Sequence, residues 1–306
     1  MQHRAVQDDA ETHRNPVVPD NERKACDAVA RILEGRYAEV RSNERCPERD
    51  GRGPPVDYWF NIGGQTFAVE HTRIEAFPEQ IRTGVDFSAF VEPIERALDK
   101  NMPSPGSYSL IFRIDPTDGI SRKRLPALRQ SIIEWAHRAA AELHAESPVR
   151  MDRYHKPHGS DNTRVVEIDG VEVRLRRQVH WAENGSFDGR LHVMRVAPDA
   201  VEDQRRTRIQ TALDAKCPKL LECKNLGARS ILLLENVDIA LTNHAYVAET
   251  LELLLAGRRD TPDEILYLDT TGHWTIWSIV NDGRFWPDED QLPPYHDFDS
   301  GNLTEV

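Results

Sequence analysis

Asp57 and Glu70 are the residues whose types and spacing could do chemistry. They lie in the stretch PPVDYWFNIGGQTFAVEHT, residues 54–72, which alternates like a β-hairpin around Gly63 and Gly64. In the register of a two-residue turn at these glycines, Asp57 lies directly opposite Glu70. Two carboxylates opposed across strands are about 5 Å apart at Cβ, and they repel each other unless a cation lies between them or one is protonated. The pair therefore predicts a site for Mg²⁺ or a similar hard divalent ion.

The other hairpin side chains divide between two faces, because successive strand residues point to opposite sides. The face of the acidic pair also carries Trp59, Asn61, Thr66, Ala68 and Thr72. The opposite, more apolar face carries Tyr58, Phe60, Ile62, Phe67, Val69 and His71. The alternative to a metal site is a solvated pair, since edge strands often carry acids that face water and a one-residue slip would break the pairing.

Composition limits the class of protein. The chain has 306 residues, 39% hydrophobic and 29% charged, which fits a globular α/β protein with polar insertions or ends. No apolar run approaches the length of a membrane span and the N-terminal residues lack an apolar signal core, so we expect a cytoplasmic protein. The four cysteines form no CxxC pair, which favours reduced structural thiols.

The formal net charge of −12 argues against a protein that coats nucleic acid nonspecifically. The charge is uneven, however, because residues 121–129 and 205–208 are basic and no Lys or Arg follows Arg284. Each basic segment is interpreted first as a solvated helix face, and a basic binding face is the alternative.

Short apolar strands alternate with helical patterns, which predicts a central mixed β-sheet flanked by helices. We expect Pro93 to interrupt the helix that covers residues 79–100, or to divide it in two. Five segments are predicted. They are an N-terminal arm (1–20), the first part of the core (21–147), a small β-rich insertion (148–198), a helix and strands that complete the core (199–284) and an acidic extended tail (285–306).

The hairpin and the helix before it resemble the core of the PD-(D/E)xK nuclease-like superfamily, which has the restriction-endonuclease-like fold. The stretch Pro55-Val56-Asp57 matches the first part of the motif with one inserted residue, and Glu70-His71-Thr72 matches the second. A helix that bears Glu22, a strand, the hairpin, a helix and another strand are in the expected order over about residues 20–115. Residues 212–235 also resemble the segment that comes after such cores in several bacterial members.

The resemblance implies a metal-dependent nuclease, a hydrolase that cleaves phosphodiester bonds of nucleic acid, DNA more than RNA. It implies Mg²⁺ or Mn²⁺ held by Asp57 and Glu70, with the backbone carbonyl of His71 and the carboxylate of Glu22 as further ligands. Because His71 faces away from Glu70 in this register, we do not expect its imidazole to be a ligand. Glu22 has a simpler interpretation, as an acidic residue in the first turn of a helix. Pairing into a homodimer is also implied, since related nucleases often pair to cut two strands.

One position departs from the motif, because Thr72 stands where the family usually has a lysine that orients the attacking water. Thr cannot carry charge, so either the lysine has moved or the activity is lost. Lys216 and Lys219 are the candidates for a moved lysine, and Lys216 follows Ala212 and Leu213 on the apolar side of a predicted helix. The alternative is a lysine whose stem packs while its amine reaches water.

As a nuclease, the protein would use residues 121–129, 205–208 and the insertion 150–197 for phosphate contacts. His155, His158, His180 and His192 lack metal-ligand spacing and are interpreted as surface or core residues. Two other classes stay open: a catalytically inactive nuclease-like module that binds or regulates, and a different α/β protein whose acidic pair is only solvated.

Overall fold

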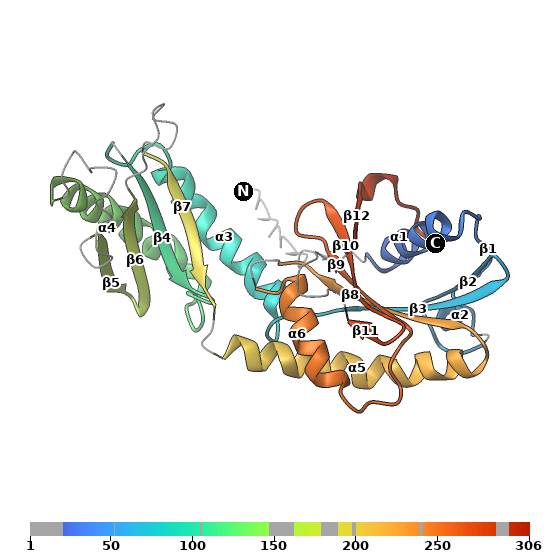
Figure 1. Cartoon of the computed structure of the whole chain (residues 1–306). Helices are drawn as coiled ribbons and strands as arrows, with labels where there is room; N and C mark the ends of the chain where they lie inside the picture. Colours follow the sequence, from blue (N-terminus) through green and yellow to red (C-terminus); the bar gives the residue numbers. More distant parts are fainter. Residues whose placement is uncertain are drawn as a thin grey trace, which may run out of the picture.

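Two β-sheets organise the chain, as the cartoon of the computed structural model shows (Figure 1). The structure describes residues 21–51, 53–104, 106–146, 162–178, 189–197, 200–238, 241–285 and 294–306. The predicted N-terminal arm, residues 1–20, lies outside the described residues. Among the described helices, none is long and apolar enough to cross a bilayer.

The larger sheet has eight strands and is mixed, which confirms the predicted fold class. Its order is β1-β2-β3-β8-β9-β10-β11, and β12 also pairs with β10. The strands are β1 (Ser42–Arg45), β2 (Tyr58–Ile62), β3 (Gln65–Arg73), β8 (Arg229–Asn236), β9 (Glu264–Asp269), β10 (Trp274–Asn281), β11 (Arg284–Phe285) and β12 (Tyr295–Phe298). The pairs β3–β8 and β8–β9 are parallel, whereas the other pairs are antiparallel.

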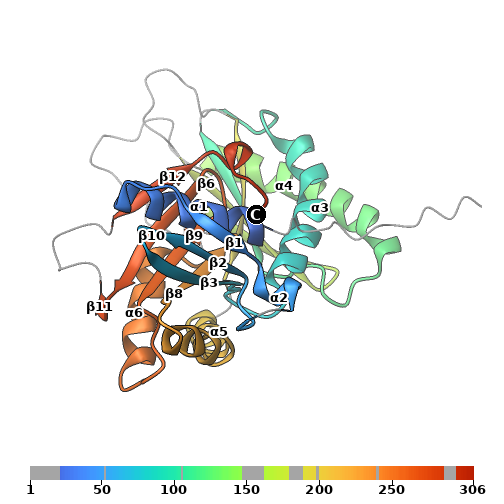
Figure 2. The same cartoon turned by 90° about the vertical axis from the view of Figure 1, so that its right-hand side faces the viewer.

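Helices cover both faces of this sheet (Figure 2). Helix α1 (Glu22–Tyr37) packs its buried side on the apolar hairpin face, where Tyr58, Phe60 and Val69 are buried. Helices α5 (Val201–Asn225) and α6 (His244–Leu255) cover the other face, and the short helix α2 (Pro47–Asp50) lies between β1 and β2 in the chain. The predicted division of the hairpin into an apolar face and a face for the acidic pair is therefore confirmed.

The smaller sheet has four strands in the order β5-β6-β4-β7. They are β5 (Thr163–Ile168), β6 (Val171–Gln178), β4 (Ser107–Arg113) and β7 (Leu191–Val196). Helices α3 (Gln80–Leu98) and α4 (Leu125–Glu146), with the 3₁₀ turn η1 (Arg122–Arg124) before α4, pack on one face of this sheet. Pro93 does not divide α3, which is continuous. We call this sheet with its helices the second lobe.

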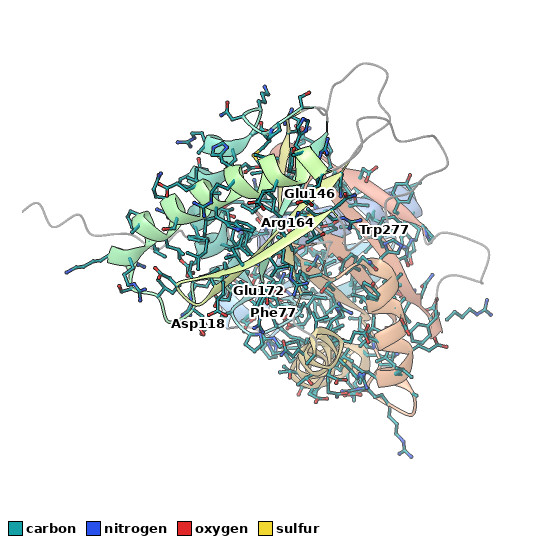
Figure 3. The ribbon with its side chains drawn as sticks, turned by 90° about the vertical axis from the view of Figure 1, so that its left-hand side faces the viewer. Phe77, Asp118, Glu146, Arg164, Glu172 and Trp277 are labelled. Carbon is teal, nitrogen blue, oxygen red and sulfur yellow. The ribbon has the colours of Figure 1, made fainter. Side chains whose placement is uncertain are left out.

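The second lobe begins earlier in the chain than the insertion predicted at 148–198. Strand β4 was expected in the first part of the core, yet it pairs with β6 and β7 and not with the larger sheet. The physical reason is that Tyr108, Leu110 and Phe112 of β4 alternate toward α3 and α4 and complete their core. Figure 3 shows the outer end of this lobe, where Arg164 of β5 pairs with Glu146 at the end of α4.

The C-terminal residues also differ from the extended tail predicted at 285–306. Strand β12 pairs antiparallel with β10, so that Trp274 lies opposite Phe298, and the 3₁₀ turn η2 (Ser300–Asn302) comes next. Leu303 is then buried against α1. The acidic composition of this segment suggested a solvated tail, but its few apolar side chains are enough to fix it on the sheet edge.

Candidate metal centre

The hairpin has the register that the sequence predicted. Ile62 pairs with Gln65 and Tyr58 with Val69, and the turn glycines have φ of +57° and +78°. Glycine adopts this left-handed backbone without the steric cost that a Cβ brings. Asp57 stands one residue before β2 and is not a strand residue itself. Its Oδ2 accepts a hydrogen bond of 2.7 Å from the backbone N–H of His71 on β3, the residue after Glu70.

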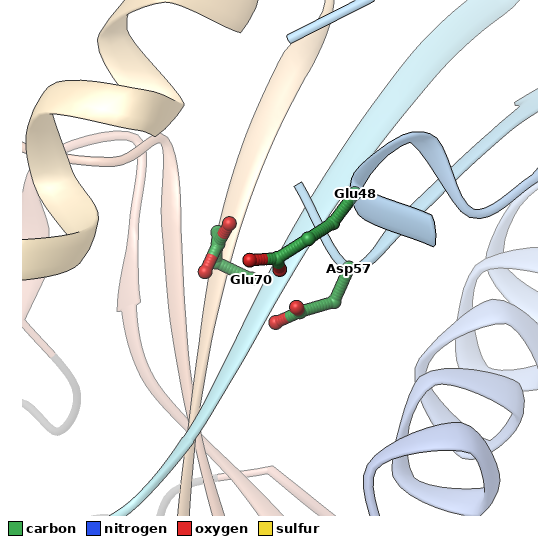
Figure 4. A group of neighbouring side chains, drawn as sticks. All are labelled: Glu48, Asp57 and Glu70. Carbon is green, nitrogen blue, oxygen red and sulfur yellow. The ribbon is translucent and has the colours of Figure 1, made fainter. Parts of the chain in front are cut away.

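Three carboxylates converge at this point, from Glu48, Asp57 and Glu70 (Figure 4). One oxygen from each lies within 4.8 Å of the others, and Glu70 is fully buried. The sequence prediction did not include Glu48. A signal was present nonetheless: Pro47 at the first helical position, followed by an acidic residue, is typical of a helix start.

Two lysines of α5 reach the same carboxylates. Lys216 Nζ forms an ion pair with Glu70 Oε2 and lies 3.7 Å from Asp57 Oδ2. Lys219 Nζ lies 3.3 Å from Glu70 Oε1 and 3.6 Å from Glu48 Oε1. The two lysines are three residues apart, so they project from one side of the helix toward the hairpin. Both candidate lysines therefore lie beside Glu70, and Lys216 also lies near Asp57.

The burial of this cluster changes its protonation. Burial, followed by the negative charge of Glu70, raises the pKa of Asp57 to about 7. Burial likewise raises the pKa of Glu70, although the hydrogen bond from Lys216 opposes the shift. A hydrogen bond with the Asp57 carboxyl lowers the pKa of Glu48. The surroundings therefore favour the protonated form of Asp57 and the ionised form of Glu48.

The ammonium of Lys216 is held in its charged form. Burial disfavours that charge, but the hydrogen bond and the charge of Glu70 more than compensate and raise the pKa of Lys216. Three carboxylates thus face two ammonium groups. Clustered carboxylate oxygens at this spacing are ligands that Mg²⁺ and Mn²⁺ prefer, so the residues present fit such an ion.

Three further residues of the sequence prediction are distributed around the centre. Glu22 lines the same cavity, and its Oε1 accepts a hydrogen bond of 3.1 Å from Arg49, but it is not one of the three converging carboxylates. Thr72 is half-buried beside Leu234 on the parallel strand β8, and its side chain carries no charge. The imidazole of His71 points to the opposite side of the sheet, where its Nε2 lies 2.8 Å from Glu235 Oε2. As expected from the register, the His71 ring does not face the carboxylates.

The centre opens into a cavity of about 340 Å³, lined by Glu22, Glu48, Arg49, Asp57 and Lys216. Acidic and basic groups therefore line one small opening. Carboxylates can hold a cation there, while Arg49 and Lys216 can receive an anionic group of a substrate. Such a lining suits chemistry on a phosphate ester.

The two basic segments of the sequence are largely paired within the protein. Arg205 is buried and donates to the carbonyl oxygen of Leu241, while Arg208 pairs with Glu75. Arg124 pairs with Asp169, and Arg129 donates to backbone carbonyls of α3. Of the four predicted non-ligand histidines, His192 is exposed on β7, whereas His155, His158 and His180 lie outside the described residues.

Comparisons of the chain with protein-family models, with curated proteins and with solved structures found no match. The fold is a mixed α/β sheet covered by helices on both faces, and its distinctive site is a buried centre of carboxylates and lysines.

Proposed function

We propose that the protein is a metal-dependent phosphodiesterase, a nuclease that hydrolyses nucleic acid and DNA in particular. The observation that carries the proposal is the contact of Lys216 with both Glu70 and Asp57 across the cavity. The motif of PD-(D/E)xK nucleases, which the hairpin resembles, needs an ammonium group beside two carboxylates. Here Thr72 stands at the usual position, and α5 supplies the ammonium from a different part of the chain.

In this proposal Asp57, Glu70 and Glu48 hold Mg²⁺ or Mn²⁺. Such an ion, when bound, would lower the pKa of a water and neutralise negative charge on the scissile phosphate. Lys216 points its ammonium at the same place, where it stabilises the charge that develops on the phosphate oxygens. Lys219 holds Glu70 and Glu48 in position through its two ion pairs. The backbone N–H of His71 donates to Asp57 Oδ2 and so fixes the orientation of this carboxyl group.

A second candidate is a nuclease-like module that binds or regulates without cutting. The observation in its favour is that Glu70 already has two lysine partners, which compete with a metal ion for the same oxygens. The third interpretation from the sequence, a merely solvated acidic pair, does not fit the burial. Glu70 is 0% exposed and Asp57 is 8% exposed.

Cleavage of supercoiled plasmid in the presence of Mg²⁺ or Mn²⁺ tests the proposal. The wild-type protein should nick the plasmid, and Asp57→Asn and Glu70→Gln should each abolish nicking while the proteins remain folded. Glu305→Gln changes an exposed carboxylate that pairs weakly with Arg23, and it is the matched control that should retain activity. If the wild-type protein binds DNA but never cuts it with either metal, the second candidate, a nuclease-like module that binds without cutting, is correct.

Light scattering of the protein with and without DNA tests the proposed homodimer.

A further inference from the structure

Arg45, the last residue of strand β1, lies over the aromatic ring of Trp59 on the neighbouring strand. Its Cζ is 4.7 Å from the centroid of the Trp59 ring, and the two residues are paired in the β1–β2 register. Arg45 is exposed, and in the described part of the chain no carboxylate forms an ion pair with it. Its guanidinium is thus held in place by a cation–π contact and still offers its N–H groups to a ligand.

The chain joins Arg45 directly to the carboxylate centre. Strand β1 ends at Arg45, and helix α2 then supplies Glu48 to the acidic cluster and Arg49 to the cavity lining. Trp59 is two residues after Asp57, so the two side chains belong to the same face of the hairpin. Trp59 also packs on a small buried cluster that includes Cys223 of α5, which fixes its ring. The two arginines therefore flank Glu48 along a short, well-anchored stretch.

We propose that Arg45 and Arg49 bind the backbone phosphates of a polynucleotide on either side of the phosphate at the carboxylate centre. This proposal rests on the proposed nuclease function and adds the place where the substrate strand lies. A planar guanidinium that is already immobilised loses little conformational freedom when it binds phosphate, and it can form two parallel hydrogen bonds. Fixed cations are also needed here, because three carboxylates would otherwise repel a polyanion.

The two arginines differ in how they are held, which separates their contributions. Arg49 Nη2 lies 3.1 Å from Glu22 Oε1, so it must share its charge between the protein and a phosphate. Arg45 is held by an uncharged ring and keeps its full charge for the ligand. We therefore assign the larger part of phosphate binding to Arg45.

Binding of a fluorescein-labelled DNA duplex by anisotropy tests this inference. The full chain is titrated into the labelled duplex in buffer with Ca²⁺, at several salt concentrations. The proteins compared are wild type, Arg45→Gln, Arg45→Lys and Trp59→Phe. Arg96→Gln is the matched control, since Arg96 is an exposed arginine of α3 in the second lobe that pairs with Glu92. Labelled mononucleotide in place of the duplex distinguishes a strand from a single phosphate group.

We expect Arg45→Gln to weaken duplex binding about tenfold, which corresponds to one hydrogen bond with a charged group, and to reduce the salt slope by about 0.9. Arg45→Lys should keep most of the salt slope but lose part of the affinity, because it retains the charge without the planar fork. Trp59→Phe, which retains a stacking ring, should bind nearly as well as wild type.

Three results would overturn the inference. Unchanged duplex affinity and salt slope in Arg45→Gln, with active cleavage by the wild type, would reject the role of Arg45 and leave the nuclease proposal standing. Equal affinity for the mononucleotide and the duplex would reject the claim that the two arginines bind a polynucleotide strand. Absence of both binding and cleavage in the wild type would reject the nuclease proposal itself, and this inference with it.

Discussion

The imidazole of His71 is bonded to Glu235, with 2.8 Å between His71 Nε2 and Glu235 Oε2. The backbone N–H of the same histidine donates to Asp57 Oδ2 on the other side of the sheet. Glu235 is fully buried and also accepts a hydrogen bond of 2.7 Å from Asn21. Although burial opposes its ionisation, these partners, the hydrogen bond with His71 foremost, lower the pKa of Glu235. His71 thus connects the carboxylate centre with a second polar cluster on the opposite face of the sheet.

We expect Glu235→Gln to reduce the free energy of unfolding by about 1–3 kcal/mol. The substitution keeps the shape but puts an amide N–H where His71 and Arg73 meet a carboxylate, so at least one buried group loses its charged partner. Urea denaturation followed by circular dichroism measures the change. Glu305→Gln, on an exposed side chain, should change stability by less than about 0.5 kcal/mol. Equal stability of the two variants would show that the His71–Glu235 contact contributes nothing.

Lys216→Met should lower the free energy of unfolding of the metal-free protein and raise its affinity for Mn²⁺. The ammonium of Lys216 lies beside both Glu70 and Asp57, so its loss leaves Glu70 with Lys219 as its lysine partner and takes the nearby ammonium from Asp57, at a cost of about 3 kcal/mol of stability. The same carboxylates then hold Mn²⁺ with one competing ammonium fewer, and Mn²⁺ should raise the melting temperature of the variant more than that of wild type.

Lys219→Met is the matched comparison for that experiment. Lys219 lies farther from Glu70 and does not contact Asp57, so its removal should have the same effects to a smaller extent. If Mn²⁺ stabilises neither variant more than it stabilises wild type, the lysines do not compete with a metal ion at this centre.

Gly64 in the hairpin turn and Gly35 in helix α1 allow two matched substitutions to alanine whose effects on stability should be opposite. Gly64 has φ of +78°, and a Cβ there meets no atom within 4 Å, so Gly64→Ala tests backbone strain alone. We expect it to destabilise the protein by about 1–2 kcal/mol. Gly35 lies in α1 with open space around it and without a positive φ, so Gly35→Ala should stabilise the protein by about 0.5–1 kcal/mol. Thermal unfolding of both variants measures the difference, and shifts in the same direction would contradict it.

Asp263 should make stability depend on pH in the acid range. Its Oδ2 accepts hydrogen bonds of 2.9 and 2.8 Å from Ser230 N and Oγ, and Lys224 Nζ lies 2.6 Å from Oδ1. Burial opposes ionisation, but Lys224 and Ser230 lower the pKa of Asp263 below its ordinary value of 3.8. The unfolded chain therefore binds the proton first, and the stabilisation present above about pH 4 is lost as the pH falls through the lower folded value.

Asp263→Asn should accordingly lower the free energy of unfolding by about 1–2 kcal/mol at pH 7. The difference in this free energy between the variant and wild type should become smaller below about pH 4. Urea midpoints between pH 3 and pH 7 measure this. Asp169→Asn, at a half-exposed carboxylate that pairs with Arg124, is the control for the substitution itself at a surface ion pair. A constant difference across the range would mean that the pKa of Asp263 is the same in the folded and the unfolded chain.

The sequence was sufficient for the parts of the centre that depend on local geometry. The Gly63-Gly64 turn fixes the hairpin register, and this register alone brings Asp57 and Glu70 together. Helical spacing on α5 predicted that Lys216 points inward, and an inward lysine requires acidic partners. These are short-range consequences of turn and helix periodicity.

The rest depends on contacts between distant segments. Glu48 joins the centre because the loop around it folds back on the hairpin, with Glu48 N donating to Val56 O, and no local pattern specifies that return. Strand β4 alternates in the same way whichever sheet it joins, and only the cores of α3 and α4 decide between them. The pairing of β12 with β10 is a long-range contact of the same kind.

The parallel pairing of β3 with β8 has a consequence for how this chain folds. Phe67 lies beside Arg229, so two strands that are adjacent at the middle of the larger sheet are far apart in the chain. The entire second lobe lies between these two strands in the sequence. Closing such a long loop from a disordered chain is entropically costly and slow. If the second lobe, with its own core, forms first, it shortens the effective loop, and the acidic centre on β3 is then completed late in folding. Stopped-flow refolding should accordingly show a fast phase from the second lobe before the residues around Glu70 become protected from exchange.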